Sequence, residues 1–389
     1  MPDASGQRLP QHNPAQTAAA DRPASEGGIL RGRNPDLDGL RGLAALSVAL
    51  GHCYEQVTGL GLWGTSLKNF HAMPTAQVVA RVLSAFFPSD AAVMVFFVLS
   101  GHVLWSSFRR KNMRFFRDLP DYTSARLYRL LPLTIVSGMA IGLISAAPAY
   151  ELVRNMILLS HSMNGVLWSL QAEMVASAML FILWGLTKGT TWKMLVALLL
   201  SIAALPFCRG NPLIMFLPAF ILGAGISSVP TWVWRSSWLL AAGVVVLVFT
   251  NVILGHGGVD RCLEMGGATM VVGAVSEGRL PFLHWRLPLF LGAISYPFYL
   301  THVLGLIMAQ PFQDMLHFSS PYPLIAARAM LSIPPTIVIA WLLHVLVEVP
   351  VQRARPQIRW PFTIEWSAGL RPLVRRPLQA DVPALARRR

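Results

Sequence analysis

The chain has 389 residues, of which 54% are apolar and only 13% are charged, and its formal net charge is +14. Soluble domains carry about 25% charged residues, so this composition excludes an ordinary soluble enzyme. It indicates an all-α, polytopic integral membrane protein. The positive charge does not point to a nucleic-acid partner, because Lys and Arg are concentrated in the tails and in alternate loops, as membrane orientation requires.

The chain divides into three parts by composition. Residues 1–36 are polar and rich in Pro, Gln and Arg, which predicts a disordered cytoplasmic tail and not a cleavable signal peptide. Residues 37–350 hold the long apolar runs and are predicted to form one transmembrane domain. Residues 351–389 are Arg- and Pro-rich, and we expect this basic cytoplasmic tail to lie against anionic lipid headgroups.

The apolar runs predict about ten transmembrane helices, since roughly 20 residues cross a bilayer. They fall at 38–57, 90–108, 128–148, 165–187, 192–207, 212–228, 236–254, 266–278, 287–309 and 323–348. The segment 76–87 is too short to span and carries Arg81, so we expect an interfacial helix. Pro334 and Pro335 should kink or break the last span.

The distribution of basic residues orients these spans. With ten spans, 25 of the 32 Lys and Arg residues fall on the side of the N-terminus and five on the opposite side. This asymmetry predicts that both termini are cytoplasmic. Three cysteines remain, and their spacing suggests no metal site. Cys53 lies in the first span, whereas Cys208 and Cys262 fall in outer loops, where they form either a disulfide or two free thiols.

The first span contains two residues that are costly in hydrocarbon, Arg41 and His52. Eleven helical residues turn through about three turns plus 20° and rise about 16 Å, so the two side chains share one face. Arg41 would lie near the cytoplasmic surface and His52 near the middle of the membrane. Either the pair is structural, with a snorkelling arginine and a hydrogen-bonded histidine, or the imidazole serves as a base.

Six stretches in a fixed order favour the functional interpretation. They are LDGLRGLAAL at the start of the first span, FFVLSG (96–101), RLYRLLPL (126–133), WSLQAE (168–173), SYPFYLTH (295–302) and VEVP (347–350). Over residues 36–355 the chain therefore resembles acyltransferase family 3, whose members move acyl groups from coenzyme A thioesters to envelope carbohydrates. Two positions depart from the family pattern: His102 stands where an aromatic residue is usual, and Gln171 where a small or β-branched one is.

The resemblance implies an O-acyltransferase that takes an acyl group, expected to be acetyl, from acyl-CoA in the cytoplasm. The acceptor would be a hydroxyl of a polysaccharide, glycolipid or related envelope molecule, and the location a bacterial inner membrane. His52 would be the catalytic base or a covalent acyl carrier. Arg41 would face the coenzyme A phosphates or the thioester oxygen.

The other motifs supply further candidates for the donor site. Arg126 and Arg129 are three residues apart on one helix face and are predicted to contact the phosphates of coenzyme A. Glu173, within a span, either orients His52 or pairs with Arg126 or Arg129 to join two helices.

For the acceptor, the resemblance points to His302, Tyr299 and Ser100. His302 could equally be a hydrogen-bonded core histidine, and the tyrosines an aromatic platform or a membrane-interface belt. No metal is expected. The competing function is a multi-span transporter that uses intramembrane Arg, His and Glu as relays, which we rank lower because the sequence has no internal repeat.

Overall fold

A computed structural model describes residues 34–59, 71, 73–207, 211–253, 258–316, 318, 321–359 and 363–366. The predicted disordered tail lies almost entirely outside these residues. Residues from Pro35 onward form one compact unit.

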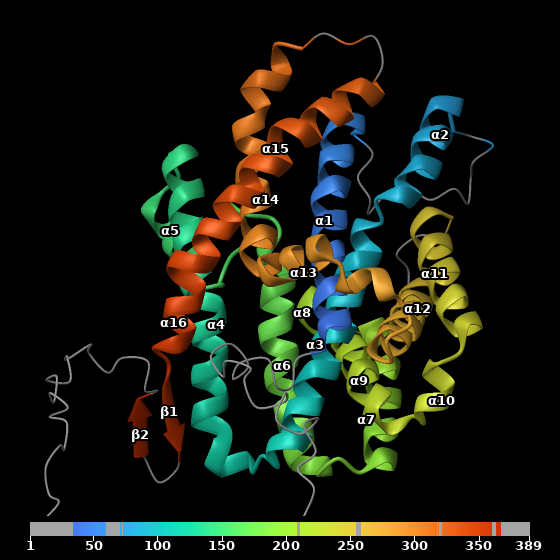
Figure 1. Cartoon of the computed structure of the whole chain (residues 1–389), viewed down its shortest axis with the longest axis vertical. Coiled ribbons are helices and arrows are strands. Elements are labelled where there is room, and N and C mark those ends of the chain that lie inside the picture. The colour runs from blue at the N-terminus through green and yellow to red at the C-terminus, as the bar shows by residue number, and fades with distance from the viewer. Residues whose placement is uncertain are drawn as a thin grey trace, which may run out of the picture. The chain divides into compact units, whose positions relative to one another are not determined.

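The described part of this unit is almost entirely helical (Figure 1). The helices of its first half are α1 (Pro35–Thr58), α2 (Thr75–Leu83), α3 (Ser89–Lys111), α4 (Phe115–Ile144), α5 (Ala149–Met156), α6 (Leu167–Thr187) and α7 (Thr191–Ala203). The second half holds α8 (Pro212–Met215), α9 (Leu217–Gly225), α10 (Thr231–Trp234), α11 (Ser237–Val252), α12 (Gly258–Ser276), α13 (Arg286–Ala293), α14 (Ser295–Asp314), α15 (Pro321–Leu343) and α16 (Val349–Arg353). Short 3-10 turns occur at Ser84–Phe86, Leu205–Phe207, Ile226–Ser228 and Pro281–His284, and a π-helix at His344–Glu348.

Helix α1 lies in the middle of the bundle and packs against α3, α13, α14 and α15 (Figure 1). Its glycines allow this close approach. A methyl carbon at Gly42 would lie 2.4 Å from the backbone nitrogen of Gly292 in α13. Gly101 of the FFVLSG motif faces the backbone of Phe220 in α9 in the same way. Part of each motif is therefore explained by helix packing alone.

Each predicted span corresponds to one or more helices, but the count of ten is only partly supported. Among the described residues, four helical runs are long and apolar enough to cross a membrane: Gln77–Lys111, Phe115–Ile144, Leu167–Thr187 and Pro321–Arg353. A fifth span results if α13 and α14 are taken together. The helices α7, α9 and α11 are apolar but shorter.

Two local features differ from expectation. Of the kink or break expected at Pro334 and Pro335, the break does not occur, because helix α15 continues through both prolines. The predicted ninth span is instead bent by 79° between α13 and α14. Pro297 in the first turn of α14 suits this restart, because the first backbone N–H groups of a helix have no partner within it. The bend starts α14 inside the bundle, beside the site described below.

The segment 76–87 is helical, as predicted, and Arg81 within it is only 1% exposed. Cys53 and Cys262 are free thiols, whereas Cys208 lies outside the described residues. After α16 the chain forms an antiparallel hairpin of β1 (Pro356–Arg359) and β2 (Thr363–Trp366), which was not expected in an all-α protein. Strand β1 packs against α4. Just before this strand, Nη1 of Arg355 donates a hydrogen bond to Oδ1 of Asp121 at 2.9 Å.

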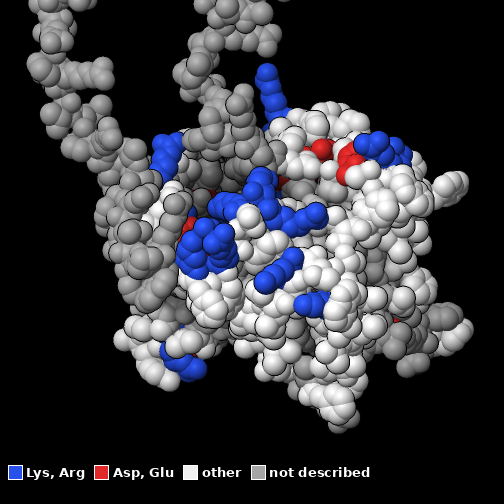
Figure 2. All heavy atoms as spheres, turned by 90° about the horizontal axis from the view of Figure 1, so that it is seen from below, with Lys and Arg blue, Asp and Glu red and all other residues white. Residues whose placement is uncertain are grey.

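Basic side chains gather at one end of the bundle, as Figure 2 shows. This basic end includes the end of α3 and the start of α4, with the exposed residues Arg109, Arg110, Lys111, Arg114 and Arg117. This arrangement agrees with the charge asymmetry of the sequence. That both termini lie on the cytoplasmic side stays a prediction.

Candidate functional site

Residues from three of the motifs meet at Glu173. Its Oε1 accepts a hydrogen bond from Nη1 of Arg126 at 3.3 Å and one from the hydroxyl of Ser100 at 3.5 Å. Helices α3, α4 and α6 are thus joined through one carboxylate. Because Arg126 is buried, this ion pair also compensates a charge that would otherwise be costly inside the bundle.

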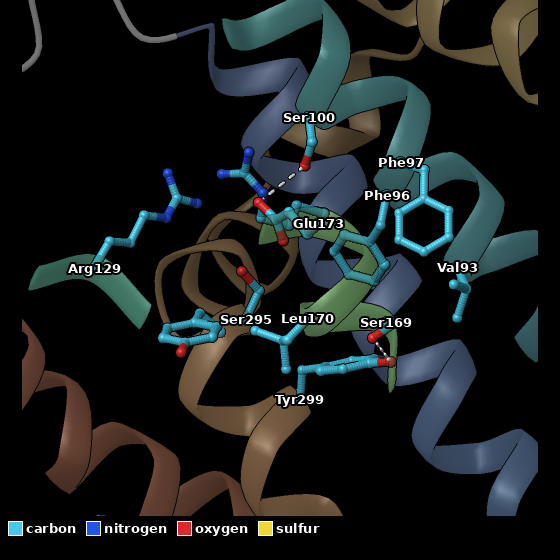
Figure 3. A pocket seen from close by; sticks show the side chains of 12 residues that line it. Val93, Phe96, Phe97, Ser100, Arg129, Ser169, Leu170, Glu173, Ser295 and Tyr299 are labelled. Atoms are coloured by element: carbon cyan, nitrogen blue, oxygen red, sulfur yellow. Dashed lines mark hydrogen bonds between the residues drawn. The ribbon is translucent and has the colours of Figure 1, made fainter. Parts of the chain in front are cut away.

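A pocket with about 520 Å³ of empty space opens beside this pair (Figure 3). We call it the arginine pocket, because Arg41 of α1 and Arg129 of α4 both line it. The other residues that line it are Val93, Phe96, Phe97, Ser100, Ser169, Leu170, Glu173, Ser295, Tyr296 and Tyr299.

The two arginines predicted to bind phosphate have different surroundings. Arg129 is half-buried and lines the arginine pocket, and it has no hydrogen bond or ion-pair partner among the described residues. Arg126 is paired with Glu173 and does not line the pocket. Arg129 is therefore the one that can bind an anion without breaking an existing contact. The remaining arginine of the pocket, Arg41, lies 3.4 Å from Asp38.

His52 lines a second pocket, with about 840 Å³ of empty space, which we call the histidine pocket. Its lining comprises Val48, His52, Gln56, Ser89, Asp90, Val93, Gly165, Val166, Trp168, Tyr299, Val303 and Leu306. Nδ1 of His52 lies 3.2 Å from the Glu55 carboxylate, one turn further along α1. Because a carboxylate accepts hydrogen bonds, this contact favours, for the neutral ring, the tautomer with its proton on Nδ1, in which Nε2 is an acceptor.

His302 packs directly on His52. The two rings are stacked, with centroids 5.3 Å apart and planes inclined by 17°. Nδ1 of His302 donates to the backbone oxygen of Tyr299 at 2.7 Å, while its buried Nε2 has no partner within the described structure. His302 lines neither pocket, so its closest link to the site is through His52.

The two pockets are adjacent and share only Val93 and Tyr299 in their linings. The Tyr299 hydroxyl lies 2.8 Å from that of Ser169, and Ser169 donates to the Val166 backbone oxygen at 2.9 Å. Since Ser169 has one proton to give, Tyr299 must be the donor to it. Figure 3 shows the Tyr299–Ser169 bond at the edge of the arginine pocket. A tyrosine hydroxyl thus stands between the arginines and His52.

The structure brings the predicted site residues together in a way that the sequence did not fully anticipate. Glu173 does not orient His52: it contacts Arg126 and Ser100, the structural alternative, and Glu55 holds the histidine instead. Of the predicted acceptor residues, Tyr299 lines both pockets and Ser100 only the arginine pocket.

The two departures from the family motifs line neither pocket. Gln171 donates to the backbone of Leu158 at 3.0 Å and contacts His161 at 3.1 Å, so it anchors the loop before α6. His102 packs at the close contact of α3 with Gly223 of α9. Both are therefore accounted for by packing.

The sequence analysis missed four polar residues around His52. Gln56, Ser89 and Asp90 line the histidine pocket, and Glu55 contacts the imidazole. A signal was available for Glu55 and Gln56, which lie three and four residues after His52 and so near it on the helix surface. No such signal was available for Ser89 and Asp90, because they lie on a different helix from His52. Among the described residues, no cluster of His, Cys, Asp or Glu could hold a metal ion.

Comparison with known families agrees with this arrangement. The model of acyltransferase family 3, described as an acyltransferase domain, matches residues 34–345, which include both pockets. No curated protein and no solved structure matches the chain. The match spans most of the chain, and the protein therefore belongs to acyltransferase family 3.

Proposed function

We propose that this protein is a membrane O-acyltransferase. It transfers an acyl group, expected to be acetyl, from acyl-CoA to a hydroxyl of a polysaccharide, glycolipid or related envelope acceptor. One observation carries the proposal: a pocket lined by two arginines and a pocket lined by His52 share Val93 and Tyr299 as a common wall. This is the arrangement that a reaction between an anionic donor and a neutral hydroxyl requires.

The donor would bind in the arginine pocket. Coenzyme A carries phosphate groups, and guanidinium groups bind phosphate through paired, charge-assisted hydrogen bonds. Arg129 is available for this because it has no competing partner in the described structure. Arg41 lines the same pocket and would bind a phosphate or the thioester oxygen. The aromatic rings of Phe96 and Phe97 offer an apolar wall for the pantetheine arm and the acyl group.

The chemistry would take place at the wall between the pockets. Nε2 of His52 accepts the proton of the acceptor hydroxyl, and the oxygen attacks the thioester carbon. The carbon–sulfur bond then breaks, and the coenzyme A thiolate takes the proton from Nε2 of His52 to leave as the thiol. In the covalent alternative, Nε2 attacks the thioester carbon, the carbon–sulfur bond breaks, and the thiolate leaves as the thiol with the proton that the ring gives up from Nδ1. The acceptor oxygen then attacks the acyl carbon, the bond to Nε2 breaks, and the acceptor's proton returns to the imidazole.

Tyr299 would stabilise the negative charge that develops on the thioester oxygen. Its hydroxyl is the polar group common to both pockets, and its bond to Ser169 keeps it at the wall. In the resting protein the Tyr299 proton is donated to Ser169, and it would turn from Ser169 to the thioester oxygen as the negative charge develops there.

The test is acyl transfer by purified protein in lipid nanodiscs. Labelled acetyl-CoA is supplied with the glycan fraction of the cell envelope after alkali has removed its esters. We expect His52→Ala to abolish transfer of label to glycan, while His161→Ala, an exposed histidine that lines neither pocket, retains it. Full transfer by the His52 variant would refute the mechanism. Acid-precipitable label on wild-type protein without acceptor would identify the covalent route.

We also propose that the basic end faces the cytoplasm, with both termini there, in a bacterial inner membrane. The positive-inside asymmetry supports this orientation, and coenzyme A would then reach the arginine pocket from the cytoplasm. Fluorescent-protein and alkaline-phosphatase fusions at the C-terminus test it: fluorescence without phosphatase activity is expected, and the reverse would overturn the orientation.

A further inference from the structure

The histidine pocket differs in chemistry from the arginine pocket. Among the described residues that line it, none is Lys or Arg, and its polar side chains are imidazole, carboxyl, amide and hydroxyl groups. They come from three helices, with His52 and Gln56 on α1, Ser89 and Asp90 on α3, and Tyr299 on α14. Trp168 of α6 adds an aromatic surface. Such a lining suits a neutral ligand with many hydroxyl groups better than a phosphate or a long acyl chain.

One of these groups lacks a hydrogen-bond partner among the described residues. The Ser89 hydroxyl is buried, with the residue only 3% exposed, and makes no hydrogen bond within the described structure. A buried hydroxyl without a partner is unfavourable, because it has lost its bonds to water. The group is therefore poised to bond to a molecule that enters the pocket.

A second group is held in one orientation by a neighbour. Oε1 of Gln56 accepts a hydrogen bond from Nη2 of Arg328, while Nη1 of Arg328 donates to Gln310 at 2.9 Å. Because the Gln56 oxygen is occupied by a donor, its amide NH₂ remains to donate to the pocket. Arg328, a charged residue in the longest apolar run, acts here as a positioning residue. The carboxyl of Asp90, 6% exposed, supplies an acceptor beside Ser89.

We propose that the histidine pocket is the acceptor site and that it binds a sugar ring. Ser89, Asp90 and Gln56 would bind hydroxyls next to the one that His52 deprotonates, and Trp168 would contact the apolar face of the ring. Donors and acceptors at fixed positions reject ligands that lack the matching hydroxyls, so these residues determine which hydroxyl is acylated. This inference rests on the proposed acyl transfer and adds the residues that select its acceptor.

Two substitutions test the site with little risk to the fold. Ser89→Ala removes a hydroxyl that has no protein partner, so it should not lower the unfolding temperature. Asp90→Asn keeps the shape of the side chain and exchanges a carboxyl oxygen for an amide. Asp121→Asn, the same exchange at the basic end and outside both pockets, is the matched control. The assay measures transfer from labelled acetyl-CoA while the de-esterified envelope glycan fraction is titrated, together with binding of acetyl-CoA alone.

We expect Ser89→Ala to raise the half-saturating amount of glycan about three- to tenfold, as one lost hydrogen bond implies. Asp90→Asn should raise it by a similar factor or more, since the exchange places an amide NH₂ donor where a carboxyl oxygen stood. Acetyl-CoA affinity should stay within twofold in both, and the control should match wild type.

The outcomes separate the two proposals. If wild type transfers the label and both variants keep the wild-type glycan dependence, the acceptor site is wrong and the acyltransferase function stands. If both variants instead lose acetyl-CoA affinity or unfold at lower temperature, their role is structural and the site is also wrong. If wild type itself transfers no label to the glycan fraction, the proposed function fails.

Discussion

The imidazole rings of His52 and His302 are stacked with their centroids 5.3 Å apart. His302 contacts neither pocket, and its Nδ1 is bonded to the backbone of its own helix. The stack therefore ties His52 of α1 to α14 and restricts the rotation of the reactive ring. This argues that His302 supports the base and does not bind the acceptor itself.

Replacing His302 by Ala and by Phe separates ring packing from nitrogen chemistry. His302→Ala removes a buried ring and should cost about 2–4 kcal/mol of stability, with transfer below a tenth of wild type because His52 is no longer held. His302→Phe keeps a ring and should retain at least about a third of the rate. Thermal unfolding and acyl transfer measure the two effects. If Phe were as inactive as Ala, the Nε2 atom of His302 would have to take part in the chemistry.

The Arg126–Glu173 ion pair predicts that substitutions at these two residues have non-additive effects on the free energy of unfolding. Glu173→Gln leaves the buried Arg126 without its counter-charge, which should destabilise the protein by about 2–4 kcal/mol. Arg126→Met leaves Glu173 with the Ser100 hydroxyl as its remaining hydrogen-bond partner among the described residues and should also destabilise the protein. In the double variant neither charge remains, so the loss should be smaller than the sum by about 1–3 kcal/mol. Additive losses in detergent unfolding experiments would show that the pair carries no coupling.

Replacing Arg129 should weaken donor binding and leave stability unchanged, in contrast to the substitutions of Arg126 and Glu173. Since it has no ion-pair partner among the described residues, Arg129→Gln should leave the unfolding temperature unchanged. It should weaken acetyl-CoA binding by about ten- to a hundredfold, the cost of one or two charge-assisted hydrogen bonds. Calorimetric titration with acetyl-CoA measures this, and Lys111→Gln at the exposed end of α3 is the control. Unchanged affinity would remove Arg129 from the donor site.

Tyr299→Phe tests the hydroxyl at the wall between the pockets. The ring and its contact with Phe96 remain, so folding and acetyl-CoA affinity should be preserved. The maximal rate should fall by about ten- to a hundredfold, since a donor to the developing oxyanion is lost. Ser169→Ala leaves the tyrosine hydroxyl in place without its acceptor and should lower the rate far less. Equal losses in both variants would mean that the hydrogen bond is structural and that Tyr299 does not act on the thioester.

The sequence predicted the parts of the site that lie on one helix and missed those that depend on how helices meet. Arg41 and His52 could be assigned to one face of α1 from helical geometry alone. The partner of Glu173 was left open between two helices, because spacing within a chain does not show which of several charged residues it will contact. Ser89 and Asp90 were overlooked, since at the start of an apolar run they look like ordinary helix-terminal residues.

The wrong predictions about the fold also concern how one helix meets another. Hydropathy finds apolar runs but not their direction, so the 79° bend between α13 and α14 was read as one straight span. Proline rules predicted a kink or a break at Pro334 and Pro335, and the helix does not break there, where α15 packs against α14 and α1. The glycines of the motifs could be noted in sequence, but their function as contact points needed the neighbouring backbone.

Gly42 provides the sharpest test of that packing function. An added methyl carbon would lie 2.4 Å from the nitrogen of Gly292 and 2.7 Å from the oxygen of Pro288. These are backbone atoms, which cannot rotate away as a side chain can, so α1 and α13 must separate. We expect Gly42→Ala to cost about 1–3 kcal/mol or more of stability and to displace Arg41, one residue earlier, from the arginine pocket.

Gly266→Ala in α12 is the matched control for this change. No atom lies within 4 Å of a methyl carbon built there, and alanine favours a helix by about 1 kcal/mol over glycine. It should leave stability unchanged or slightly raised and acetyl-CoA affinity unaltered, whereas Gly42→Ala should lower both. Unfolding temperature and calorimetric titration distinguish them. Equal behaviour of the two variants would mean that α1 tolerates movement against α13, and the position of Arg41 would then not depend on the glycine beside it.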